Sequence, residues 1–190
     1  MTHHDNLKII AIVGMTGSGK STAVDYFTSK GYPKVHFGNM AYEIMAERGI
    51  EKGEENEKKF RVDIRKELGD DVYAKKAADQ IERLHEAGQR RIIIDGIYHW
   101  EEYKTLKHLY PGEMTTIAIV GPKEMRYKRL EDREDRPQSP AISAERDYNE
   151  IESINKGGPI AIADYFVNND GSRDDLVKHL DTIANDIDFY

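Results

Sequence analysis

Near its N-terminus the chain reads Ile9-Ile-Ala-Ile-Val-Gly-Met-Thr-Gly-Ser-Gly-Lys-Ser21. The second part of this stretch, Gly14–Ser21, matches in full the pattern G-x-x-x-x-G-K-[ST] of a phosphate-binding loop. The apolar run before it is typical of a strand covered on both faces, and the apolar residues that follow have helical spacing. A strand, a glycine-rich turn and a helix in this order predict a binding site for nucleotide phosphates.

Each part of this loop has a chemical role. Glycine lets the backbone turn tightly and aim its N–H groups at phosphate oxygens, and the helix N-terminus adds a partial positive charge. Lys20 is predicted to reach the β- and γ-phosphates of ATP, and Ser21 to bind Mg²⁺. The residues expected to bind ATP are Gly14, Met15, Thr16, Gly17, Ser18, Gly19, Lys20, Ser21 and Thr22.

A second apolar run, Arg91-Ile-Ile-Ile-Asp95, ends on an acidic residue followed by Gly96. In open parallel sheets, ligands bind at the carboxyl ends of the strands. We therefore expect Asp95 to hold Mg²⁺ together with Ser21, and Gly96 to let an acceptor approach closely. On its own, an Asp-Gly pair at the end of a strand is more typical of an ordinary turn, so this prediction depends on the phosphate loop being present.

The order of the elements predicts the fold class. Strand-like runs alternate with helical patterns, which indicates a doubly wound α/β domain around a five-stranded parallel sheet. One-turn spacing of apolar residues predicts core-facing helix stripes near residues 60–68 and 176–187. A chain of 190 residues fits one domain, spanning 1–190. The five strand-like runs are 8–13, 34–37, 91–95, 115–120 and 165–167.

Composition excludes several classes of protein. With 38% hydrophobic and 33% charged residues, the chain is globular and has no apolar stretch long enough to span a bilayer. Its net charge of -7 argues against non-specific nucleic-acid binding. The absence of cysteine excludes disulfides and thiolate metal sites. Residues 1–8 lack the layout of a secretory signal. We expect a cytoplasmic protein without membrane or nucleic-acid partners, while its oligomeric state stays open.

Arginines at positions 126, 129, 133 and 136 would share one face of a helix if the segment is helical to its end. Pro137 disfavours helical geometry at Arg136, so that residue is also compatible with a loop. Phosphoryl transfer depends on positioning and charge stabilisation, which an arginine face beside a loop would supply as a closing lid. The alternative is a solvated helix with surface ion pairs. The lid interpretation assigns catalytic roles to Arg129, Arg133 and Arg136.

Three further residues are candidates for binding the phosphoryl acceptor. Arg61 and Arg65 lie one helical turn apart and could clamp a phosphate, or pair with nearby acids on the surface. Tyr98 follows Asp95 and either lines the acceptor pocket or packs in the core. The run Asn155-Lys156-Gly157-Gly158 lacks the aspartate of a guanine-reading motif, which argues against a GTPase.

In these residues and motifs, the chain resembles the P-loop nucleoside monophosphate kinase superfamily. It is most similar to dephospho-CoA kinases and to the small adenylate-kinase-related proteins of archaea. Phe37-Gly-Asn-Met40 is similar to the Gly-Asp-Met that opens the acceptor-binding helices of adenylate kinases. Residues 163–172 are similar to the last strand and loop of dephospho-CoA kinases, where the backbone around Asn169 and Gly171 would border the adenine of ATP.

The resemblance implies an acceptor-binding region at about 38–88 and a lid at about 129–145. It also exposes a departure, because Asn39 stands where dephospho-CoA kinases offer an acidic residue as a base. A nucleoside monophosphate is already largely deprotonated near pH 7 and needs only charge neutralisation. A nucleoside monophosphate is therefore the predicted acceptor, with a hydroxyl acceptor of the dephospho-CoA type or a P-loop ATPase switch as alternatives. The expected acceptor-binding residues are Asn39, Arg61, Arg65, Gly96 and Tyr98.

Overall fold

The structure is a computed structural model that describes residues 5–190, apart from the side chains at positions 54, 55 and 58. Residues 1–4, which belong to the stretch without the layout of a secretory signal, lie outside the described residues. The strands are β1 (Lys8–Val13), β2 (Lys34–His36), β3 (Arg91–Asp95), β4 (Met114–Val120) and β5 (Tyr165–Asn168). The helices are α1 (Lys20–Ser29), α2 (Phe37–Glu47), α3 (Glu54–Leu68), α4 (Val72–Glu86), α5 (Trp100–Leu109), α6 (Lys123–Glu131), α7 (Pro140–Glu152), α8 (Gly157–Ala161) and α9 (Arg173–Asp186).

The strands form one parallel sheet in the order β2-β3-β1-β4-β5. This confirms the predicted fold class, and each predicted strand is present with its ends shifted by at most one residue. Strand β1 lies between β3 and β4, and its Ile12 pairs with Asp95 of β3. The phosphate loop and Asp95 therefore leave the sheet side by side, at the edge where α/β proteins bind ligands.

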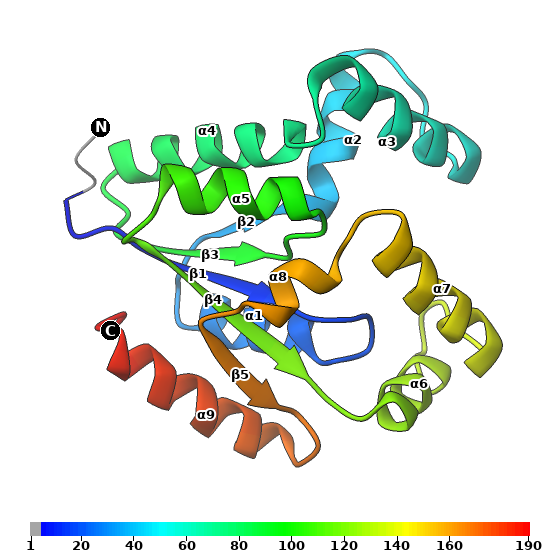
Figure 1. Ribbon diagram of the computed structural model, residues 1–190. Coiled ribbons are helices and arrows are strands. Elements are labelled where there is room, and N and C mark those ends of the chain that lie inside the picture. The colour runs from blue at the N-terminus through cyan, green and yellow to red at the C-terminus, as the bar shows by residue number, and fades with distance from the viewer. Residues whose placement is uncertain (1–4) are drawn as a thin grey trace.

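Helices cover both faces of the sheet (Figure 1). Helices α2, α4 and α5 pack on one face, and α1 and α9 pack on the other. Alternate residues of β1 enter the two cores: Ile9 and Ala11 face the first, Ile10 and Ile12 the second. Burial on both sides explains why this strand is continuously apolar instead of alternating.

The predicted helix stripes are confirmed with one correction. Phe60 and Ile64 of α3 are buried, but Leu68 is 46% exposed because it is the last residue of that helix and lies beyond the core contact. In α9 the stripe is buried through Ile183, and Ile187 follows the end of the helix. A capping box between Ser172 and Asp175 fixes where α9 begins.

Two helical regions flank the carboxyl edge of the sheet (Figure 1). Helices α2, α3 and α4 occupy the stretch predicted to bind the acceptor. The predicted lid comprises the end of α6, a loop and the start of α7, where the Ser139 side chain caps the helix and Pro140 takes its first position. None of the helices in the described part of the chain has the length and apolar character that crossing a membrane requires.

Candidate active site

The phosphate loop has the tight backbone that its sequence predicts. Gly17 and Gly19 adopt φ angles of 80° and 102°, which side chains rarely tolerate. A Cβ atom at Gly17 would lie 2.7 Å from the carbonyl oxygen of Arg126, and one at Gly19 would collide with the amide of Asn169. Neighbouring elements therefore press on the outside of the loop.

Asn169, the residue after β5, supports this loop. Its buried amide donates a 2.8 Å hydrogen bond to the carbonyl of Ser18, and its own carbonyl accepts a 2.9 Å bond from Arg129 Nη2. Gly171, the second residue predicted to border adenine, lines a separate cavity of about 270 Å³ between β5 and α9. The adenine roles of both residues stay predictions.

A cavity of about 300 Å³ opens at the N-terminus of α1, against the phosphate loop. Among the described residues, no carboxylate lines this cavity. Such a concentration of positive charge at a helix N-terminus favours a polyanion such as a triphosphate. The cationic side chains that line it are Lys20, Arg129, Arg133, Arg146 and Lys156.

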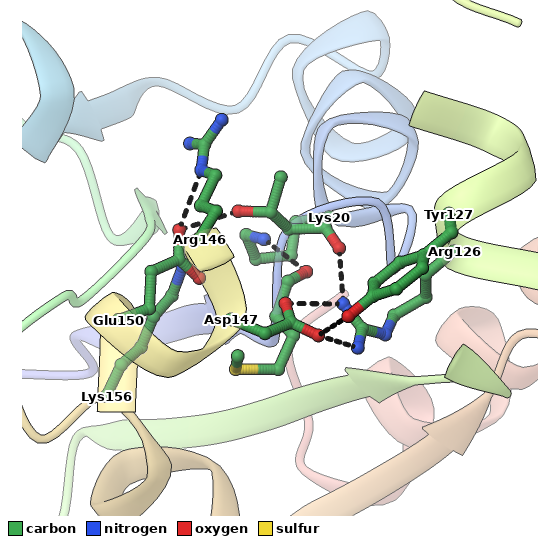
Figure 2. A network of polar contacts seen from close by, with 9 residues as sticks. Lys20, Arg126, Tyr127, Arg146, Asp147, Glu150 and Lys156 are labelled. Carbon is green, nitrogen blue, oxygen red and sulfur yellow. Dashed lines mark hydrogen bonds and ion pairs between the residues drawn. The ribbon is translucent and has the colours of Figure 1, made fainter. Parts of the chain in front are cut away.

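Lys20 lies folded against its own loop in this structure. Its ammonium donates a 2.9 Å hydrogen bond to the carbonyl of Met15 (Figure 2). Burial, and next the nearby charge of Lys156, lower the pKa of Lys20 to about 7. A phosphate in the cavity would supply the countercharge that this lysine lacks.

A network of ion pairs joins the loop to α7 (Figure 2). Glu150 accepts hydrogen bonds from Thr16 Oγ1 at 2.7 Å and from Lys156 Nζ at 2.7 Å, and it pairs with Arg146 at 3.2 Å. Burial alone would raise the pKa of Glu150, but the charge of Lys156 and these hydrogen bonds hold it below its usual range. Glu150 therefore stays ionised beside the cavity.

Arg126 makes a second connection between the same elements. Its guanidinium donates to the carbonyl of Thr16 at 2.8 Å and to Asp147 of α7 at 3.0 Å. The side chain is almost fully buried, and Tyr127 also donates to Asp147. Arg126, the one arginine of the predicted face without an assigned catalytic role, therefore anchors the loop to α6 and α7.

The other lid arginines separate in the structure. Helix α6 ends at Glu131, so the segment is not helical to its end, and Arg136 lies in a loop, which is the alternative that Pro137 favours. Arg129 and Arg133 line the phosphate cavity, and Arg129 Nη1 is buried without a hydrogen-bond partner. Arg136 is exposed on the following loop with a φ of 54°, outside the lining of that cavity. Its predicted catalytic role would require the loop to move.

A second cavity, of about 520 Å³, adjoins the first. Tyr98 and Arg146 line both cavities, so they stand at the boundary between them. Burial raises the pKa of Tyr98 to about 12, which keeps its hydroxyl protonated as a donor. Asn39, Arg61, Arg65 and Tyr98 line this second cavity, whereas Gly96 is outside its lining. The acceptor-binding roles of these residues stay predictions.

The two predicted clamp arginines differ in their partners. Arg65 Nη2 donates to the fully buried Glu102 at 2.9 Å, while its Nε is buried without a partner. Arg61 makes long, 3.4 Å contacts with Glu57 and with the Tyr42 hydroxyl, and is more exposed. Arg65 is thus held rigidly by α5, whereas Arg61 remains free to adjust to a ligand.

Sequence reasoning missed His36, the last residue of β2. Its Nδ1 lies 2.5 Å from Asp95 Oδ2, and its Nε2 faces Gly38, where a Cβ atom would lie only 2.6 Å away. Gly96 has a φ of 83° and lies against the Tyr98 ring. A polar residue at the end of a predicted strand was the available signal, because the carboxyl ends of parallel strands meet at the same edge of the sheet.

The predicted metal ligands have the chemical character, though not the number, that magnesium requires. The Ser21 hydroxyl and the Asp95 carboxylate are hard oxygen donors, which Mg²⁺ prefers. Within residues 5–190 no group of three or more histidine or acidic side chains gathers closely enough to hold a metal ion by itself. Magnesium would therefore need phosphate oxygens and water as its remaining ligands, as is usual for this ion.

Comparison with known proteins agrees with this geometry. A family model described as an AAA domain matches residues 10–155. A UPF0200 protein of Thermococcus gammatolerans is 35% identical over 182 residues, covering 94% of this chain and 95% of the relative. The chain belongs to the UPF0200 family and carries its AAA domain.

Solved structures place this UPF0200 chain among the P-loop kinases in fold. TT1252 from Thermus thermophilus superposes with a TM-score of 0.63 at 20% identity, covering 95% of this chain and 97% of that protein. Dephospho-CoA kinase from Campylobacter jejuni gives a TM-score of 0.55 at 16% identity, covering 96% and 98%. The predicted resemblance to P-loop kinases is therefore confirmed at the level of the fold, which is all that a likeness at these identities shows.

Proposed function

We propose that this UPF0200 protein transfers the γ-phosphoryl group of ATP to a small, anionic, nucleotide-like acceptor. The observation that carries this proposal is the pair of adjoining cavities that share Tyr98 and Arg146. One cavity has the phosphate loop and a surplus of positive charge, and the other has arginines and aromatic rings suited to an acceptor. A donor and an acceptor bound there would meet at the shared residues.

Within this proposal, Lys20 and the loop amides hold the transferring group, and Ser21 and Asp95 hold Mg²⁺. Arg129 and Arg133 neutralise the charge that develops during transfer. Arg61, Arg65 and Asn39 bind the acceptor. A nucleoside monophosphate suits this cavity, because the acceptor phosphate needs countercharge and no strong base.

One observation favours a second candidate, a hydroxyl acceptor. The prediction of a monophosphate relied on the missing acid at Asn39, but the His36 imidazole beside Asp95 lies at the same edge of the sheet. A carboxylate-oriented imidazole is a common general base for hydroxyl groups. The choice between the two acceptor classes therefore depends on experiment.

The test measures melting temperature and ADP formation with a panel of nucleoside monophosphates and dephospho-CoA. Stabilisation by one acceptor in the presence of a non-hydrolysable ATP analogue, together with many-fold faster ADP formation, supports the kinase. Slow ADP formation that no acceptor stimulates favours the ATPase switch instead. A His36→Gln variant separates the acceptor classes, since transfer to a phosphate would survive it and transfer to a hydroxyl would not.

A further inference from the structure

Lys156 occupies an unusual place for a lysine. It lies at the corner between α7 and α8, and its side chain is only 3% exposed. Asn155 just before it adopts a left-handed φ of 52°, and the Lys156 amide bonds back to the carbonyl of Glu150 at 3.1 Å. Gly158 lies so close to Trp100 of α5 that a Cβ atom would be 2.6 Å from the ring. Contacts with α7 and with α5 therefore fix this corner, and the Lys156 side chain points into the interior of the protein.

The ammonium of Lys156 lies at the wall of the phosphate cavity. It is 2.7 Å from Glu150 Oε2 and 5.2 Å from the centre of the Tyr98 ring, at the boundary with the acceptor cavity. Its charge is close enough to Lys20 to contribute to the lowered pKa of that residue. Lysines 20 and 156 therefore face the same space from opposite elements.

A purely structural ion pair explains this arrangement poorly. Buried ion pairs contribute little net stability, because desolvation of both charges offsets their attraction. Glu150 also accepts hydrogen bonds from two other donors, Thr16 and Arg146, so its carboxylate does not need Lys156 as a hydrogen-bond partner. Three carboxylates, Glu150, Asp95 and Asp147, act on the two lysine ammonium groups. The five cationic side chains that line the cavity still outnumber them, and a phosphate ligand would neutralise the surplus.

We propose that Lys156 is a second lysine of the phosphate site, which contacts the γ-phosphoryl group of bound ATP from the side opposite Lys20. This inference rests on the proposed function and adds a catalytic residue to it. During transfer, the bond from the γ-phosphorus to the β–γ bridging oxygen breaks and a bond to the acceptor oxygen forms. Lys156 gives up no proton in this step, and its charge stabilises the γ-phosphoryl oxygens. Glu150 keeps Thr16 and Arg146 when Lys156 turns toward the phosphate.

The test compares the binding of ADP with that of a non-hydrolysable ATP analogue in Lys156→Gln. We expect the Kd for ADP to stay within about twofold, while the Kd for the analogue rises about tenfold, as for the loss of one charge-assisted hydrogen bond. With the acceptor found above, kcat should fall by roughly 10²–10³. Lys156→Arg should recover part of both effects. The matched control is Lys75→Gln, which removes an exposed lysine paired with Asp71 on α4.

Equal weakening of ADP and the analogue, or no change in either, would overturn the role of Lys156. If the single variant fails to fold, Lys156→Gln combined with Glu150→Gln removes both members of this ion pair, and the same binding comparison is made against Glu150→Gln alone. The two proposals fail separately. Wild-type protein without acceptor-dependent turnover would end the kinase proposal, whereas loss of the preference for the γ-phosphate in Lys156→Gln would still support the lysine.

Discussion

Helix α1 has a lysine at each end, and the two side chains have opposite electrostatic environments. Lys30, at the C-terminal end, donates to Asp181 at 3.0 Å and to the Tyr190 hydroxyl at 2.9 Å, and lies 4.6 Å from the centre of the Tyr26 ring. Desolvation opposes its charge, but hydrogen bonds with Tyr190, Tyr26 and Asp181 together outweigh it and raise the pKa of Lys30. Lys20, at the N-terminal end, has a backbone carbonyl as its hydrogen-bond partner and a lowered pKa.

The contrast separates a structural charge from a functional one. A helix dipole stabilises a cation at its C-terminus and destabilises one at its N-terminus. Lys30 therefore gains from its position and from its partners, and it contributes to folding. Lys20 opposes the dipole, is desolvated and has other cations nearby, which is unfavourable until an anion arrives. Electrostatic cost concentrated at one place identifies a candidate binding site more reliably than charge alone.

The largest effect should come from Arg133, which lines the cavity at the N-terminal end of α1. If it stabilises transition-state charge, Arg133→Ala should lower kcat by about 10³ while changing ATP binding far less. Steady-state kinetics with the acceptor measure this. Arg136→Ala is the comparison, since Arg136 lies outside the cavity lining and a similar loss there would show that the loop closes. Arg133→Ala constants within about twofold of wild type would end the lid assignment.

A second prediction uses proton uptake on ATP binding to test the difference between Lys20 and Lys30. Because the pKa of Lys20 is about 7 in the free protein, the side chain is largely neutral at pH 8 and charged at pH 6. A bound phosphate favours the charged form, so ATP binding at pH 8 should take up to about one more proton in wild type than in Lys20→Ala.

Calorimetry in buffers of different ionisation enthalpy measures this uptake. The excess should shrink toward zero at pH 6, where Lys20 already carries its proton. Lys30→Ala should match wild type, because the raised pKa of Lys30 keeps it charged throughout. An excess that stays the same at both pH values would show that Lys20 does not titrate near neutrality.

The smallest effect is expected at the other end of the helix. Asp181 accepts hydrogen bonds from Tyr26, Tyr190 and Lys30. Because this side chain is 38% exposed, Asp181→Asn should cost only about 1 kcal/mol in the free energy of unfolding. Thermal denaturation should show a fall in Tm of about 2–4 °C. Turnover should not change, and a large loss of kcat would contradict a purely structural role.

Sequence reasoning succeeded where the signal is local. The strand, loop and helix of the phosphate site are encoded in consecutive residues, and continuous apolarity reports the two-sided burial of β1 and β3. The position of Asp95 at the end of β3 was predicted because it ends such an apolar run. The end of α6 was not, since the arginine spacing continues past Glu131 although the helix does not.

Contacts made by the tertiary fold were missed. Thr16 and Glu150 are 134 positions apart in the chain, and no local pattern joins them. Lys156 was weighed only as part of a guanine-reading motif, and its burial depends on how α7 and α8 meet the phosphate loop. His36 pairs with Asp95 across 59 positions. Helix and strand periodicity predict which face is buried, but not which distant charge lies opposite.

The most direct test of the account compares Lys20→Ala with Lys30→Ala in one assay of labelled γ-phosphate transfer from ATP to the acceptor. We predict that Lys20→Ala lowers turnover by roughly 10²–10³ without lowering the melting temperature of the nucleotide-free protein. Lys30→Ala should keep wild-type turnover and melt at a lower temperature. Undiminished transfer by Lys20→Ala would contradict the claim that this loop holds the transferring phosphate.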